Sequence, residues 1–393
     1  MTRPAGGAPQ WHAAPAGPIP RPSLSHLKAL LGPYGLFEHA CGPLPRHGNG
    51  YCTDDAGRAL ALACRLPDDP HAEELAEATL GFLERAHDGG GGFRLRLGPD
   101  GRWTADPPSE DAAGRALLGL GVACSCAPWE ALRERAGNLF LQAASFRPRA
   151  ARAAAYALLG ATEAMASPEA PDGLRRAAQH LTRDLIGVPT GLLPGAAAKK
   201  VPAGNEKVLP GNEKVLASQW RWPEPRLSYA NALLPHACMS AASALGDSAA
   251  LRSSLELLWW LVMHESHGGH FSFSPVGGRG PGDKKPAFDQ QPIEAASMAH
   301  ACATALALSE EDRWEGPFWA AVGWFLGHND AGATMWDPAT GGGFDGLRSD
   351  GVNANQGAES TIAFVSTMVL AQAQAASASA DNSSDTDAVA APT

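Results

Sequence analysis

Residues 110–144, EDAAGRALLGLGVACSCAPWEALRERAGNLFLQAA, contain two helical segments of opposite character. The first, over 109–125, carries Ala, Gly and Leu on several faces, as expected of a helix surrounded by other helices. The second, over 129–145, alternates apolar positions with Glu, Arg and Gln at a helical period, as expected of a helix with one face in water. The pair predicts a buried inner helix followed by an outer helix.

The same alternation recurs along the chain. Small residues fill DDAGRALALA from Asp54, ARAAAYALLGA from Ala151, EAASMAHACATALAL from Glu294 and AESTIAF from Ala358, whereas HAEELAEATLGFLERA from His71 is amphipathic. Helical periodicity predicts about twelve helices, over 23–31, 53–66, 71–86, 109–125, 129–145, 148–164, 172–185, 225–245, 247–264, 291–308, 311–328 and 354–376. Six inner and six outer helices joined in sequence predict an all-α fold, an (α/α)6 toroid.

Three glycine-rich loops follow outer helices and precede inner ones. They are HDGGGGFRLRLGPDGRW from His87, SHGGHFSFSPVGGRGPG from Ser266 and TGGGFDGLRSDGVN from Thr340. Paired glycines with a phenylalanine and a later turn predict short β-hairpins. Their common placement lengthens one rim of the toroid, where a binding site would be built.

The composition divides the chain into one domain with two tails. Residues 1–22 and 376–393 hold few large apolar side chains, so we expect disordered tails around a toroid domain over 23–375. Residues 187–222 lack helical periodicity and contain a tandem GNEKVL over 204–209 and 211–216. This predicted surface insertion is either a lid over the rim or a repeat without function.

Charge and cysteine content exclude several classes of protein. The formal net charge is −10 and no basic cluster occurs, which argues against a nucleic-acid partner. The seven cysteines form no C-x-x-C pair, so neither a disulfide framework nor a structural zinc site is indicated. With no signal-peptide pattern and no 18-residue apolar run, we expect a cytoplasmic protein without a membrane partner.

Acidic side chains occur in the first turns of the predicted inner helices. Helix capping and the helix dipole account for some of them, at about 0.3–1 kcal/mol each. They account less well for Glu294 and Glu359, which lie among Ala, Ser, Met and Ile, where an unpaired carboxylate is costly. We predict Glu294 and Glu359 as the catalytic pair, with Asp55, Asp111 and Asp289 as competing candidates.

Amides and aromatic rings near these acids are typical of sites for polyhydroxylated ligands. The predicted substrate-binding residues are Arg58, Arg115, Gln291, Asn355, Gln356, Trp222 and His300. His236 and His300 on inner helices are alternatively general acid and base, or satisfied core histidines. His264, His267 and His270 are spaced like metal ligands, but Gly268 and Gly269 break the helix that would align them, so we predict no metal and no other cofactor.

Three stretches resemble the helical toroid region of bacterial carbohydrate-active proteins, a six-hairpin glycosidase-like group often associated with glycosyltransferases. They are FDQQPIEAASMAHA from Phe288, WFLGHND from Trp324 and GGGFDGLRSDGVNANQGAESTIAF from Gly341. The resemblance covers most of residues 48–370 and is strongest after 285. It implies an (α/α)6 toroid that acts on saccharides. A weaker similarity, to prenyltransferase and terpene cyclase toroids, lacks their D-x-D-D motif and their zinc ligands.

The function predicted from these features is glycoside hydrolysis by two carboxylates on the rim that carries the glycine-rich loops. One alternative is a non-catalytic saccharide-binding or scaffolding domain that works with a glycosyltransferase partner. A second alternative is a sugar epimerase, which requires both imidazoles to face a cavity. In the hydrolase interpretation, at least three of the five predicted carboxylates line the deepest polar pocket, and the opposite rim is plain.

Overall fold

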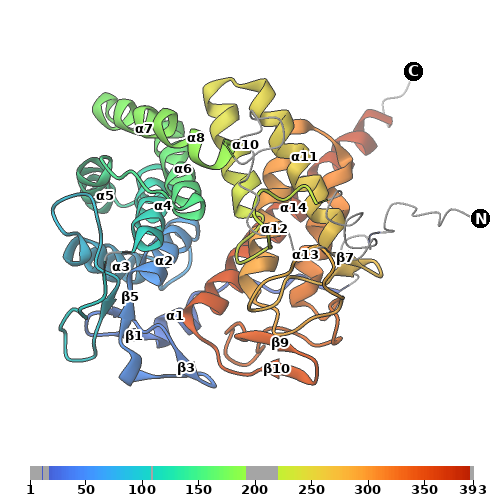
Figure 1. Cartoon of the computed structure of the whole chain (residues 1–393), viewed down its shortest axis with the longest axis horizontal. Coiled ribbons are helices and arrows are strands. Elements are labelled where there is room, and N and C mark those ends of the chain that lie inside the picture. The colour runs from blue at the N-terminus through green and yellow to red at the C-terminus, as the bar shows by residue number, and fades with distance from the viewer. Residues whose placement is uncertain (1–10, 12–16, 108, 192–219, 390–393) are drawn as a thin grey trace, which may run out of the picture.

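The computed structural model describes residues 11, 17–107, 109–191 and 220–389, and its centre is a closed ring of six helices. Figure 1 shows α2, α4 and α6 on one side of the molecule and α12 and α14 on the other. Each inner helix contacts the next, and the last contacts the first. In chain order the inner helices are α2 (Thr53–Arg65), α4 (Glu110–Cys126), α6 (Ala151–Ala166), α10 (Leu233–Leu245), α12 (Pro292–Ser309) and α14 (Ala358–Val389).

Outer helices cover the ring and alternate with the inner ones along the chain. They are α1 (Ser25–Ala29), α3 (Ala72–Ala86), α5 (Glu130–Ala143), α7 (Asp172–Leu185), α11 (Ser248–Glu265) and α13 (Glu315–Phe325), with a further short helix α8 (Gly187–Thr190). Each of α3, α5, α7 and α11 packs on the inner helix that precedes it, while α13 packs between α12 and α14. The predicted (α/α)6 toroid is confirmed.

Glycine allows the first three inner helices to approach backbone to backbone. A Cβ atom on Gly121 would lie 1.9 Å from the carbonyl oxygen of Gly160, and one on Gly119 would lie 2.4 Å from that of Gly57. Any side chain at these positions would force α2, α4 and α6 apart. The small residues that distinguish the inner helices in the sequence are therefore required by the packing of the ring.

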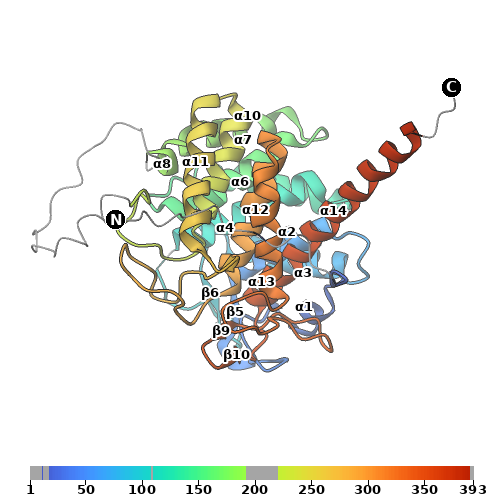
Figure 2. The same cartoon turned by 90° about the vertical axis from the view of Figure 1, so that its right-hand side faces the viewer.

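Short antiparallel β-pairs gather at one end of the ring, as Figure 2 shows for β5, β6, β9 and β10. The pairs are β1 (Leu31–Gly32) with β2 (Gly35–Leu36), β3 (Ala40–Cys41) with β4 (Leu44–Pro45), β5 (Tyr51–Cys52) with β6 (Arg96–Leu97), β7 (Ser266–His267) with β8 (His270–Phe271), and β9 (Gly346–Arg348) with β10 (Gly351–Asn353). All three glycine-rich loops contribute strands. The helices α2 and α14 begin at this end, so we call it the hairpin rim.

Helix boundaries differ from the prediction at two inner helices. We expected a helix from 225, but α10 begins at Leu233, because Leu227 instead pairs with Arg279 as an isolated β-bridge. We expected the last helix to end at 376, but α14 continues to Val389. Over 358–378, α14 is long and apolar enough to cross a membrane, and 44% of that segment is buried within the protein, where α14 completes the ring.

The tandem repeat lies outside the described residues, as do residues 1–10, 12–16 and 390–393 of the predicted tails. In the predicted N-terminal tail, Trp11 packs its ring 5.1 Å from that of Phe271. In the predicted insertion, Trp222 is 3% exposed and belongs to the core.

Replacing Gly121 with alanine should destabilise the ring, because the new methyl group meets backbone that has no rotamer by which to escape. We expect a loss of about 1–3 kcal/mol in the free energy of unfolding, measured by urea denaturation. Gly173→Ala on α7 is the matched control, because nothing lies within 4 Å of a Cβ atom there. Equal stability of the two variants would contradict the close-packed ring.

Candidate functional site

A cavity of about 440 Å³ occupies the bore of the ring and is lined by all six inner helices. On five of these helices the lining residues follow a helical stripe, and α4 contributes Leu118. On α2, for example, they are Arg58, Ala61, Leu62 and Arg65, which lie on one face. Small-molecule pockets have volumes of about 300–1,000 Å³, so the cavity is of ligand size.

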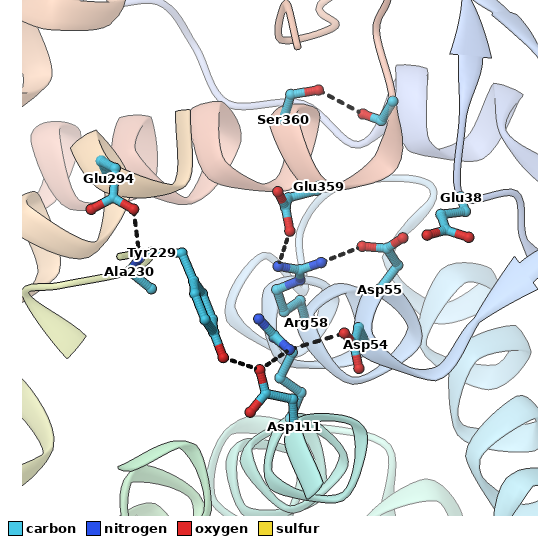
Figure 3. Close-up of polar contacts among 12 residues, drawn as sticks. Glu38, Asp54, Asp55, Arg58, Asp111, Tyr229, Ala230, Glu294, Glu359 and Ser360 are labelled. Carbon is cyan, nitrogen blue, oxygen red and sulfur yellow. Dashed lines mark hydrogen bonds and ion pairs between the residues drawn. The ribbon is translucent and has the colours of Figure 1, made fainter. Parts of the chain in front are cut away.

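Near the hairpin rim, Arg58 lies between two carboxylates (Figure 3). Its Nη1 donates to Glu359 at 2.6 Å and its Nη2 donates to Asp55 at 2.5 Å. Burial raises the pKa of Asp55 to about 7, a rise that Arg58 only partly offsets. Burial also acts to raise the pKa of Glu359, but Arg58 and Arg115 outweigh it and the pKa is lowered. Glu359 is therefore ionised at neutral pH.

A second guanidinium holds the remaining acids of this layer. Arg115 Nη1 lies 2.9 Å from Asp54 and 3.3 Å from Asp111, and its guanidinium lies over the ring of Tyr156 at 4.5 Å. Asp111 also accepts a hydrogen bond from the Tyr229 hydroxyl (Figure 3). These contacts place Asp111 and Arg115 in one network of charges around the start of α4.

Glu294 has a different environment from the one we predicted. Its Oε1 accepts from the backbone N–H of Ala230 at 2.5 Å, and its Oε2 accepts from the backbone and side-chain N–H groups of Asn231. It is 3% exposed and is not part of the cavity wall. Burial and the neighbouring Glu265 charge raise the pKa of Glu294 to about 8. These contacts fix the turn that precedes α10, which is a structural role.

Glu359 is the one predicted carboxylate of the five that lines the cavity, so the expectation of at least three is wrong. Arg58 and His300 also line it, whereas the other predicted binding residues do not.

The remaining predicted residues lie outside the cavity wall. Asp289 is half-exposed, and its Oδ1 lies 3.9 Å from Arg348 Nε; Gln291 directly precedes α12. Asn355 accepts from the backbone of Gly42, Gln356 bonds Asp337 and Thr340, and Trp222 stacks on Trp260.

The end of the cavity away from the hairpin rim carries a second set of polar side chains. Arg65 donates to Glu163 at 2.5 Å, and both line the cavity. Arg58 and Arg65 are seven residues apart on α2, so their ion pairs lie about 10 Å apart along the bore. The opposite end is therefore not plain, contrary to our expectation. Arg65 and Glu163 were missed because a charged residue near a helix end resembles an ordinary surface group.

His236 on α10 and His300 on α12 both line the cavity, with ring centroids 6.2 Å apart and planes inclined by 28°. Burial, followed by the charge of Arg65, lowers the pKa of His236 to about 4. Burial, followed by His236 and Arg65, lowers the pKa of His300 to about 3. Both imidazoles are therefore neutral at pH 7, each with one nitrogen able to accept a proton.

Among the described residues, one group of side chains brings three metal-ligand atoms within 4.8 Å of one another, namely Glu38, Cys52 and Asp55. Glu38 already accepts two hydrogen bonds from Arg96, and Asp55 accepts one from Arg58. Guanidinium groups thus neutralise both carboxylates. Of the three histidines that are spaced like metal ligands, two have other partners. His264 stacks on the ring of Trp260, and His270 forms a hydrogen bond with Asp330.

The chain matches no protein-family model and no curated protein sequence. Solved structures with the same fold include a cellobiose 2-epimerase from Bacillus thermoamylovorans, at 10% identity over 88% of this chain and 96% of that one, with a TM-score of 0.62. A D-mannose isomerase is similar at 11% identity, over 89% and 94%, with a TM-score of 0.59. A GH76 α-mannanase from Bacteroides thetaiotaomicron matches at 11% identity, over 88% and 92%, with a TM-score of 0.55. These likenesses establish the (α/α)6 toroid shared with carbohydrate-active proteins.

Removing the Arg58 guanidinium should destabilise the protein, because Asp55 must then either keep a buried charge without its partner or take up a proton at pH 8, and both cost free energy. We expect Arg58→Met to cost about 3–5 kcal/mol in the free energy of unfolding at pH 8. Adding Asp55→Asn to this variant should restore part of the loss, since it removes that charge. Arg102→Met, at a guanidinium that is 88% exposed, is the control. A stable Arg58→Met protein would show that the guanidinium does not compensate these carboxylates.

Proposed function

We propose that the chain is a sugar epimerase or aldose–ketose isomerase in which His236 and His300 transfer protons within the ring cavity. The observation that carries this proposal is the pair of neutral imidazoles that line one ligand-sized cavity with their rings 6.2 Å apart. A nitrogen of each ring is then within reach of one substrate carbon between them. General bases must be deprotonated at working pH, and both rings meet this condition.

The chemistry requires an open-chain sugar with a carbonyl group. One imidazole removes the proton from the carbon next to the carbonyl, and the C–H electron pair forms the C=C bond of an enediolate while the carbonyl oxygen gains the negative charge. Return of a proton to the opposite face of that carbon, with the carbonyl re-formed, gives the epimer. Return of a proton to the former carbonyl carbon, with the proton of the neighbouring hydroxyl transferred to the former carbonyl oxygen, gives the isomer. Arg65, in the same part of the cavity, supplies a positive charge that would stabilise the oxyanion.

The similar solved structures support sugar chemistry of this kind. They include a cellobiose 2-epimerase and a D-mannose isomerase, at TM-scores of 0.62 and 0.59. The glycosyltransferase partner and the cytoplasmic location remain predictions from the sequence.

Glycoside hydrolysis is the second candidate, because Arg58 holds two carboxyl groups whose pKa values are shifted apart. Asp55, with a pKa of about 7, would be the acid, and ionised Glu359 the base or nucleophile. Against this, Asp55 is 2% exposed and does not line the cavity. The predicted partner Glu294 is equally withdrawn from it.

His236→Asn and His300→Asn should abolish proton exchange at the carbon next to the sugar carbonyl while leaving the fold intact. The measurement is deuterium incorporation from D2O into glucose, mannose and cellobiose, followed by NMR with the full chain. His264→Asn is the matched control, because this imidazole also has a pKa lowered to about 4 by burial but lies outside the cavity wall. Exchange that persists in both cavity variants, or release of free sugar from glycosides by the parent, would refute the proposal and favour the hydrolase.

The pH dependence should reflect the lowered histidine pKa values. Because the neutral imidazoles are the active form, kcat/KM should stay level from pH 8 to about 5 and fall as the pH approaches 4. Imidazoles with ordinary pKa values would instead give a fall near pH 6.5. A decline centred at pH 6–7 would therefore argue against these two groups as the bases.

A further inference from the structure

We propose that the substrate is a reducing sugar that bears an apolar substituent, joined to a hydroxyl remote from its carbonyl carbon. The inference rests on the proposed sugar chemistry and adds the chemical class of the substrate. Its basis is a belt of apolar side chains along the bore, which we call the collar. The collar consists of Leu62, Leu118, Leu159, Leu233, Ile293 and Ile362.

Each of the six inner helices contributes one residue to the collar, so apolar groups surround the bore on every side. On α2, Leu62 lies one turn from Arg58 and one turn from Arg65. On α6, Leu159 likewise lies between Tyr156 and Glu163, which both line the cavity. On α2 and α6 the collar residue therefore lies nearer the hairpin rim than the Arg65–Glu163 ion pair, and on α10 and α12 Leu233 and Ile293 likewise precede the histidine pair.

The polar side chains beyond the collar suit the sugar itself. His236, Ser240, His300 and Thr304 line the cavity there, together with the Arg65–Glu163 ion pair. These groups supply both donors and acceptors for sugar hydroxyls. Inside the collar, by contrast, a sugar hydroxyl would lose its hydrogen bonds to water without replacement, which makes the collar a poor site for a second sugar ring.

An acyl or alkyl chain is suited to the collar for the same reason. Water in an apolar cavity has few hydrogen-bond partners, so a chain that displaces it gains the full benefit of apolar burial. The carbon next to the carbonyl must lie at the histidine pair, so the chain has to leave from the far end of the sugar, at its 6-hydroxyl. The ring of apolar side chains then receives the chain as the sugar occupies the polar end.

The test is a series of glucose and mannose esters acylated at the 6-hydroxyl with acetyl, butanoyl and hexanoyl chains, titrated calorimetrically against the full chain. We expect affinity to rise from the free sugar to the hexanoyl ester, by up to about fourfold per methylene, which is about 0.8 kcal/mol. Affinity that stays flat or falls with chain length would overturn the inference. Hexanol that binds as tightly as the hexanoyl ester would also overturn it, because the sugar would then contribute nothing.

Variants locate the effect in the collar. Leu118→Asn should abolish the dependence of the affinity on chain length. Leu251→Asn on α11 is the control, since Leu251 is also partly buried but lies outside the cavity wall. An unchanged dependence in folded Leu118→Asn would refute the assignment, and the wild-type series decides the question if that variant does not fold.

The two proposals fail in distinguishable ways. Deuterium exchange into free sugars without any gain from the acyl chain would overturn the substrate class and leave the proposed reaction standing. Chain-dependent binding of the esters, with no exchange into any sugar or ester, would support the substrate class and refute the reaction.

Discussion

The close approach of α2, α4 and α6 is the constraint on which the rest of the structure depends. Where Gly121 meets the backbone of Gly160 and Gly119 meets that of Gly57, the helix axes are as near as the main chain allows. Contacts of this kind fix the tilt of each helix, and hence which residues of each helix face the bore. The ordered stripe from Arg58 to Arg65 on α2 is a consequence.

Charge at the hairpin rim follows from the direction of the inner helices. Helix N-termini favour carboxylates in their first turns, and α2, α4, α12 and α14 all have them. Several carboxylates brought together would repel one another, and Arg58 and Arg115 offset this repulsion inside the ring. The acidic groups that are conspicuous in the sequence are thus largely engaged in holding the rim together.

The fold was predictable from the sequence because periodicity and the small-residue pattern are local properties of each helix. The site was predictable only in part. The sequence placed Glu294 on a buried helix, but the backbone groups of Ala230 and Asn231 that occupy its carboxylate come from a turn more than sixty positions earlier. Arg65 and Glu163 are likewise brought together by ring closure, and nothing in their own segments signals that contact.

The location of the histidine pair in the bore follows from electrostatics rather than from the helix dipoles. A general base is useful only when it is unprotonated, and carboxylates around an imidazole would raise its pKa and keep it charged at neutral pH. At the hairpin rim, His236 and His300 would lie among Asp54, Asp55 and Glu359. Within the bore, burial together with the positive charge of Arg65 keeps their pKa values low. In the proposed reaction, the apolar side chains of the collar would therefore serve the two bases as well as the substrate, because burial lowers the pKa of both imidazoles.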